Sequence, residues 1–174
     1  MDERILISSA REGRVARLRR WVLLAVTLLA ILFQVYVPRF FQPLAYLEVP
    51  LMVTLYFALL RRNPIRGALL GTAIGLAQDS LSHQPLGVYG IVKTLVGYFA
   101  ASISLRFDVD HTLMRWVLAY FFFCFHQFFY WLPVRALLAQ PVSFEWQTTL
   151  LFGLPNALAA VGLFSLLDRL RERP

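Results

Sequence analysis

Residues 61–101, RRNPIRGALLGTAIGLAQDSLSHQPLGVYGIVKTLVGYFAA, decide the fold of this chain. We interpret them as two membrane-crossing helices joined by a tight turn at residues 82–85. Because small residues let helix backbones approach closely in lipid, this hairpin is expected inside a helical bundle. The small residues recur at intervals of four or seven, on one face of each helix; they are Gly67, Gly71 and Gly75 in the first helix, and Gly90, Gly97 and Ala101 in the second.

The composition indicates an integral membrane protein. Hydrophobic residues make up 59% of the 174 residues, whereas a soluble domain is usually about 45–50% apolar. The chain is too short to hold a substantial soluble domain beside its spans. The net charge is +7, but the arginines flank the apolar runs. We therefore expect contacts with membrane lipid headgroups and no nucleic-acid partner.

Six apolar runs predict an all-α membrane protein, a six-transmembrane-helix bundle. The second span is short, so it either tilts little or begins in the interface. Pro38 ends the first span, and Pro50 lies near the start of the second, where proline is tolerated. In the sixth span residues 153–156 interrupt the helix: Pro155 should kink it and free a carbonyl, and Asn156 is placed to satisfy such a group or to bond another helix. The predicted spans cover residues 21–37, 44–60, 65–81, 86–105, 113–138 and 146–167.

The basic residues predict the orientation of these spans. They gather in the N-terminal segment 1–20, near residues 61–66 and 106–115, and in the tail 168–174, whereas the other loops hold only Arg39. Since lysine and arginine favour the cytoplasmic side, both termini are expected in the cytoplasm, flanking a transmembrane domain of residues 21–167. Segment 1–20 is either a solvated tail that sets this topology or a short surface-lying helix.

Two charges in the hairpin are the first candidates for a functional contact. Asp79 lies near the outer end of its helix, and Lys93 lies about two turns into the next one. Lipid penalises such charges, so we predict an Asp79–Lys93 contact, direct or through water. The alternatives are that Asp79 reaches water or headgroups, and that Lys93 extends toward the outer headgroups.

Other polar residues also fall within the predicted spans. The fifth span is unusually aromatic, and its aromatic residues either face lipid or form a surface for another protein's helix. His126, Gln127 and Arg135 of this span are expected to face the bundle or a partner. The full set of intramembrane polar candidates is Asp79, Lys93, Thr94, His126, Gln127, Arg135 and Asn156.

No catalytic, cofactor or metal site is predicted. Lys93-Thr94 lacks the preceding glycine and the strand of a phosphate-binding loop. The three histidines lie on different elements without metal-ligand spacing. No nucleophile–histidine–acid set is visible.

Three segments of the hairpin resemble the rod shape-determining protein MreD family. The most specific elements are a Gly-Leu-x-x-Asp element, a Pro-Leu-Gly turn and a Thr-Leu-x-Gly-Tyr element. They cover roughly a quarter of the chain, and the length, the six spans and Asn156 extend the likeness. The segments are LGTAIGLAQDS at 70–80, PLGVYG at 85–90 and KTLVGY at 93–98.

The resemblance implies a multi-pass protein of the bacterial inner (cytoplasmic) membrane that belongs to the cell-elongation machinery. Such a protein takes part in regulating cell shape and in peptidoglycan synthesis, without enzymatic activity or cofactor. The implied partners are MreC, through its transmembrane helix, and the glycan polymerase RodA with its transpeptidase. The cytoskeletal protein MreB lies on the cytoplasmic side.

The alternative function is that of a substrate-binding subunit of an energy-coupling-factor vitamin transporter, whose fold MreD-like proteins resemble. Those subunits carry an Ala-x-x-x-Ala-like contact in span one, whereas Ala25 and Ala30 are five residues apart here. A closed polar cavity in the outer half of the bundle would favour the transporter subunit. Side chains filling that half would favour a scaffold.

Overall fold

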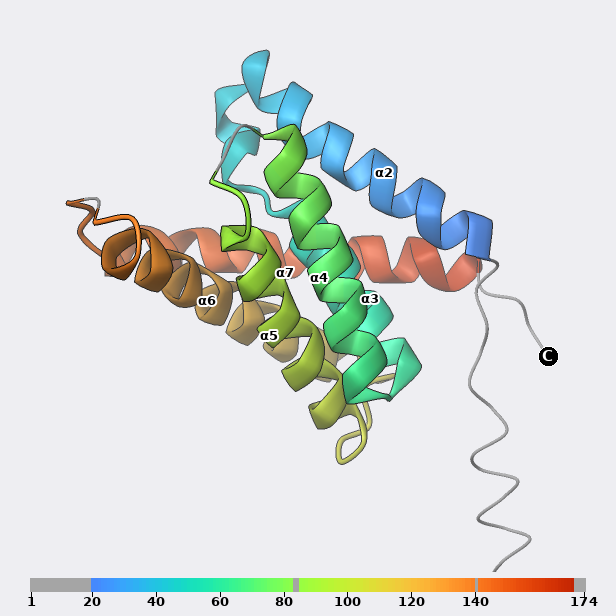
Figure 1. The fold of residues 1–174 in the computed structure, drawn as a ribbon. Coiled ribbons are helices and arrows are strands. Elements are labelled where there is room, and N and C mark those ends of the chain that lie inside the picture. The colour runs from blue at the N-terminus through green and yellow to red at the C-terminus, as the bar shows by residue number, and fades with distance from the viewer. Residues whose placement is uncertain (1–19, 83–84, 140, 171–174) are drawn as a thin grey trace, which may run out of the picture.

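The computed structural model describes residues 20–82, 85–139 and 141–170 and shows helices connected by short loops (Figure 1). The basic segment 1–19, two residues of the predicted turn at 82–85, residue 140 and the tail end 171–174 lie outside the described residues. The described part holds no strand, which confirms the all-α fold class. Its elements are α2 (Arg20–Tyr36), η1 (Val37–Arg39), η2 (Gln42–Tyr46), α3 (Val49–Arg61), α4 (Pro64–Leu81), α5 (Val88–Ser104), α6 (Thr112–Ala136) and α7 (Trp146–Arg169).

Membrane-crossing potential differs among these helices. The shorter α5 is apolar over 17 residues, and α4 interrupts its apolar residues with glycine, threonine, glutamine and aspartate. The two helices nevertheless follow the predicted third and fourth spans closely in sequence. Four segments of the described chain are long and apolar enough to cross a membrane: Trp21–Arg39, Gln42–Arg61, Thr112–Ala136 and Trp146–Arg169.

The second span is broken, which corrects the prediction of one helix over residues 44–60. A 3-10 turn, η2, ends at Tyr46, and the 13-residue α3 begins at Val49. Pro50 lies in the first turn of α3 and has no N–H to donate to the carbonyl of Tyr46, four residues earlier. The carbonyl of Tyr46 is therefore left without this helical hydrogen bond, at the point where the helix is broken.

Helix α3 lies at the centre of the bundle. Every residue from Pro50 to Leu59 is buried, and α3 packs against α2, α4, α5, α6 and α7. The closest pairs around it are α4 with α5 and α6 with α7. The sixth predicted span was expected to be interrupted at 153–156, but α7 runs as one helix through Pro155.

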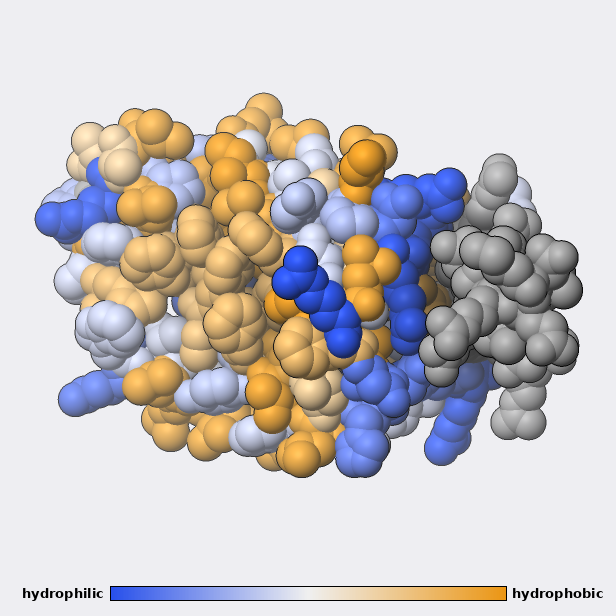
Figure 2. Space-filling model, turned by 90° about the horizontal axis from the view of Figure 1, so that it is seen from below, coloured by the Kyte–Doolittle hydropathy of each residue, from blue (hydrophilic) through white to orange (hydrophobic). Residues whose placement is uncertain are grey.

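The helix ends fall on two sides of the molecule. In Figure 1 the start of α2 and the end of α7 lie toward the lower right with the α3–α4 and α5–α6 connections, and the other connections lie toward the upper left. Figure 2 shows a face on which hydrophobic residues cover most of the area and hydrophilic residues gather toward the right, the side on which α2 begins and α7 ends in Figure 1.

A polar network ties three helices together where α3 and α7 end. Asp168 of α7 accepts hydrogen bonds from the Tyr56 hydroxyl of α3, at 2.8 Å, and from the Arg115 guanidinium of α6. The Arg115 Nε donates to the carbonyl of Val109 at 3.0 Å. These contacts fix the ends of α3, α6 and α7 relative to one another.

Candidate functional site

The α4–α5 hairpin is held by direct contact between helix backbones. A Cβ atom built on any of the three α4 glycines would overlap a backbone carbonyl oxygen of α5, so only glycine allows this approach. Lys93 thus contributes its backbone to the contact as well as its charge. The opposed pairs are Gly67 with Gly97, Gly71 with Lys93, and Gly75 with Tyr89.

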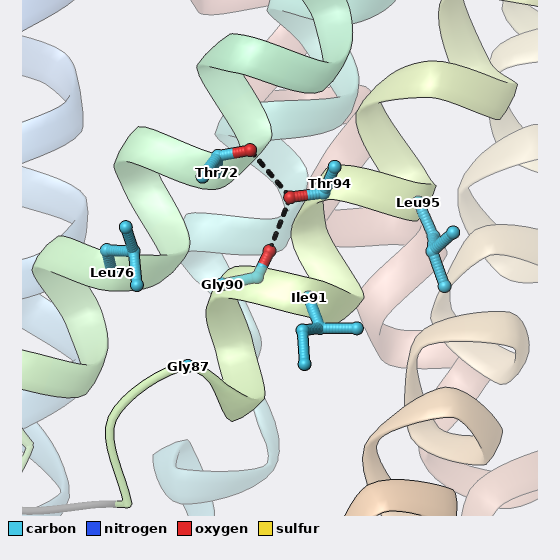
Figure 3. Close-up of a pocket in the computed structure, with 7 residues that line it drawn as sticks. All are labelled: Thr72, Leu76, Gly87, Gly90, Ile91, Thr94 and Leu95. Carbon is cyan, nitrogen blue, oxygen red and sulfur yellow. Dashed lines mark hydrogen bonds between the residues drawn. The ribbon is translucent and has the colours of Figure 1, made fainter.

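The remaining small and hydroxyl residues line the same contact. A Cβ atom on Gly90 would lie 2.9 Å from the Leu76 side chain, and the Ala101 methyl faces Gly67. The Thr94 hydroxyl is 2.6 Å from that of Thr72 and 2.6 Å from the carbonyl of Gly90. Figure 3 shows this pair of threonines between the two helices.

Asp79 binds the N-terminus of α5. Its carboxylate accepts N–H donation from Gly87 at 2.9 Å and from Tyr89 and Gly90 at 3.1 Å. Gly87 has φ +102°, a conformation that only glycine adopts easily, and it precedes the first turn of α5. The carboxylate thus accepts from amides that a helix start leaves without an intrahelical partner, next to the positive end of the helix dipole.

Of the predicted Asp79–Lys93 contact, direct or through water, the direct form is not present among the described residues, and the form through water stays a prediction. The described residues form no salt bridge between these two side chains. The amides at the start of α5 lie about one turn closer to Asp79 than Lys93 does. These amides donate hydrogen bonds to both carboxylate oxygens of Asp79. Asp79 itself is buried, so it does not reach water or headgroups in this structure.

Lys93 lies in the interior and does not extend to the surface. Its side chain is 0% exposed. The Nζ atom is 3.4 Å from Nε2 of His126 on α6 and 4.4 Å from the centroid of the Tyr89 ring. His126 is also buried, and its ring stacks near those of Tyr89 and Tyr130. Lys93 thus links α5 to α6 through His126, and its ammonium also lies over the ring of Tyr89 on its own helix.

The break in the second span is held by two side-chain amides. Asn156, near the middle of α7, accepts from the N–H of Glu48 at 2.9 Å and donates to the carbonyls of Tyr46 and Phe152 at 2.8 Å. Gln34 of α2 accepts from the N–H of Val49 at 3.2 Å. Irregular backbone at membrane depth is tolerated only where such partners replace the helical bonds.

Sequence reasoning placed Asn156 either to satisfy a carbonyl freed by Pro155 or to bond another helix, and it bonds the second span. The carbonyl of Tyr46 that it binds is the one left free by Pro50, in a different span. The sequence analysis gave no role to Gln34 or to Glu48, although Glu48 is 7% exposed. A charge two residues before a proline, at the edge of an apolar run, was the available signal for Glu48.

The other two polar candidates of α6 lie nearer the surface. Gln127 is half-buried. Arg135 is exposed: its guanidinium lies 5.8 Å from the Trp131 ring centroid and donates to the carbonyl of Val142 at 3.2 Å. It therefore does not face the interior of this bundle. The aromatic residues of α6 divide between the core, with Phe122 and Phe123, and the surface, with Phe121 and Phe128.

Replacing Asn156 by leucine is expected to lower the free energy of unfolding by ~2–4 kcal/mol. The change leaves the buried N–H of Glu48 and the partly buried carbonyl of Tyr46 without partners; a buried group left unsatisfied costs ~1–3 kcal/mol, and the partly buried one costs less. Unfolding of the purified chain by SDS in detergent micelles measures the loss. Gln147→Leu, an exposed position at the start of α7, is the matched control. Equal stability of the two variants would contradict this role for Asn156.

A shallow groove of about 280 Å³ lies on the outer surface of the hairpin (Figure 3). It has almost no polar lining, and none of the charged side chains described above reaches it. Among the described residues, no three His, Cys, Asp or Glu side chains are grouped to hold a metal ion. The groove is lined by Thr72, Leu76, Gly87, Gly90, Ile91, Thr94 and Leu95.

Comparison with known proteins relates the chain to one family. No curated protein and no solved structure matches it. The family model described as rod shape-determining protein MreD matches residues 15–167, which span all the helices described except the last two residues of α7. The match includes the glycine hairpin, Asp79 and Asn156. The chain therefore belongs to the rod shape-determining protein MreD family.

Proposed function

We propose that this membrane protein acts in rod shape determination as a non-enzymatic scaffold of the cell-elongation machinery. In this role it binds the transmembrane helix of MreC and helps to organise or regulate RodA and its transpeptidase. The family membership supports the role in cell shape. The scaffold role rests on how the interior is filled.

Packed side chains fill the interior that a vitamin-binding subunit would need to keep open. Among the described residues, Asp79, Asn156 and Lys93 bind backbone or neighbouring side chains there. This arrangement favours the scaffold over the transporter subunit. The largest fully buried side chains are Phe57, Lys93, Phe122, Phe164, Ile31, Leu55, Leu167, His126 and Gln78.

The proposed topology has six spans, with both termini on the cytoplasmic side of the inner membrane. Two observations support it. The helix ends divide into two groups in space (Figure 1), and the connections that carry Arg61, Arg62 and Arg106 belong to the same group as the start of α2 and the end of α7. An excess of arginine marks the cytoplasmic side.

Purification of the tagged chain from its native membrane in mild detergent, followed by mass spectrometry, tests the proposed function. We expect enrichment of MreC, RodA and the transpeptidase over a control purification with an unrelated multi-pass protein that carries the same tag. Recovery of a transmembrane coupling subunit with two ATPases would overturn the scaffold role and make the chain a vitamin-binding subunit.

A further inference from the structure

Lys93 and His126 are two ionisable side chains that meet in the interior of the bundle. Lys93 is 0% exposed and His126 is 1% exposed. The Nζ atom of Lys93, on α5, lies 3.4 Å from the Nε2 atom of His126, on α6. The ammonium also lies 4.4 Å from the centroid of the Tyr89 ring, which stacks near the rings of His126 and Tyr130. The contact between α5 and α6 is therefore polar at this point and closed to solvent.

The protons available to the two side chains determine how they share this contact. A neutral imidazole has one nitrogen that accepts and one that donates, whereas an imidazolium and an ammonium have donors alone. Lysine is the more basic of the two groups. The Lys93 ammonium therefore donates to Nε2 of a neutral His126, whose own proton lies on Nδ1. In this arrangement the pair carries one positive charge.

The acids near this pair do not offer His126 an opposite charge at contact distance. Glu48, which precedes α3, and Asp79 of α4 act electrostatically on Lys93, but the salt bridges of the described residues join neither acid to His126. Asp79 accepts instead from three amides at the start of α5. Helix α7, which also packs against α6, carries charged residues at its last two positions alone. The neighbouring tyrosines are uncharged near neutral pH.

A proton added to His126 would break the contact. It would occupy Nε2, remove the acceptor of the Lys93 hydrogen bond and place a second positive charge beside the first. The Nδ1 atom is buried, without a hydrogen-bond partner among the described residues, so neither proton of the imidazolium would have a described acceptor. Adjacent like charges and unsatisfied donors both cost free energy in an apolar interior.

We propose that the Lys93–His126 contact is an acid-sensitive joint, which holds the α4–α5 hairpin against α6 while His126 is neutral and loosens when His126 takes up a proton. Since the glycine–carbonyl contacts make α4 and α5 one unit, loosening the joint acts on the whole hairpin. This inference concerns the fold and stands whether or not the proposed function is correct.

The direction of the pH dependence follows from the two states of the chain. In the unfolded chain a histidine takes up a proton at about pH 6.5, whereas the folded chain opposes a proton on His126. The unfolded state therefore binds more protons below this pH, and stability falls as the pH falls. The stabilising contribution of the joint is complete above this pH and is lost progressively below it.

SDS unfolding of the full-length protein at about pH 7.5 and about pH 5.5, one unit either side of the histidine value, tests the joint. We expect the parent chain to reach half-unfolding at a lower SDS mole fraction at the acid pH. His126→Gln offers Lys93 an acceptor that cannot be protonated, so its midpoint should fall much less. His111→Gln, the same change at an exposed histidine, should fall as the parent does. A His126→Gln protein whose midpoint falls as far as that of the parent overturns the proposal.

The position of the histidine proton gives a second test, which remains readable if His126→Gln does not fold. The chain has three histidines, so a protein with His83→Gln and His111→Gln keeps His126 alone; His83 lies outside the described residues. Labelled with ¹⁵N at the imidazole nitrogens, in detergent micelles at about pH 7.5, this protein should show a neutral ring protonated at Nδ1. An imidazolium at this pH, or a neutral ring protonated at Nε2, overturns the proposal.

Discussion

Replacing Gly71 by leucine is expected to prevent α4 and α5 from packing as they do and to lower the free energy of unfolding by ~3 kcal/mol or more. Overpacking of a close contact usually costs ~1–3 kcal/mol, and more where the obstructing atoms cannot move. Here the first added carbon would meet the carbonyl of Lys93, which belongs to the α5 backbone. Relief requires separating two whole helices. SDS unfolding of the purified variant measures the loss.

Gly162 provides the matched control for this prediction. It lies within α7, and a Cβ atom there would meet nothing within 4 Å. Gly162→Leu should therefore leave the protein as stable as the parent chain, or slightly more stable, because glycine is a poor helix former. A Gly71→Leu protein as stable as the Gly162→Leu protein would show that the hairpin does not depend on backbone contact.

Replacing Asp79 by alanine should also cost ~3 kcal/mol or more. Three N–H groups lose a charged acceptor, and each buried donor left unsatisfied costs ~1–3 kcal/mol. The favourable interaction of the carboxylate with the N-terminus of α5 is lost as well. Unfolding by SDS measures the effect, and proteolysis at the turn between α4 and α5 should become faster.

Two comparison variants separate the charge from the hydrogen bonds of Asp79. Asp79→Asn keeps an oxygen that can accept but removes the charge, so its stability should lie between those of the parent and of Asp79→Ala. Asp108→Ala removes an exposed acid whose only described hydrogen bond is to the N–H of Asp110, and it should change little. If Asp79→Ala loses no more than Asp108→Ala does, the helix-capping role is excluded.

The helices of this chain could be predicted from sequence because lipid imposes long apolar runs. The predicted third and fourth spans differ from α4 and α5 by at most two residues at either end. The spacing of Gly67, Gly71 and Gly75 also predicted a close helix contact, since each residue leaves room for a neighbouring backbone. The break in the second span was harder to predict, because Pro50 is compatible with either a helix start or an interfacial entry.

The pairing of the buried charges could not be read from spacing. Opposite charge alone predicted a contact between Asp79 and Lys93. Unpaired backbone amides at a helix start, however, compete with a cation for a carboxylate. The position of Glu48 depends on how the chain returns from η2 into the bundle, and on Asn156 more than 100 residues later. Such long-range contacts leave no periodic pattern in a single sequence.

The backbone contact between α4 and α5 has a mechanical consequence. Three glycine–carbonyl contacts along the pair fix the two helices against both sliding and rotation, since a shift in either direction would bring a side chain against a backbone. The clamp between Asp79 and the first amides of α5 closes the same unit at one end. The hairpin should therefore move as one rigid body. A displacement of its turn then displaces its far end as well, beside the Arg115–Asp168 network.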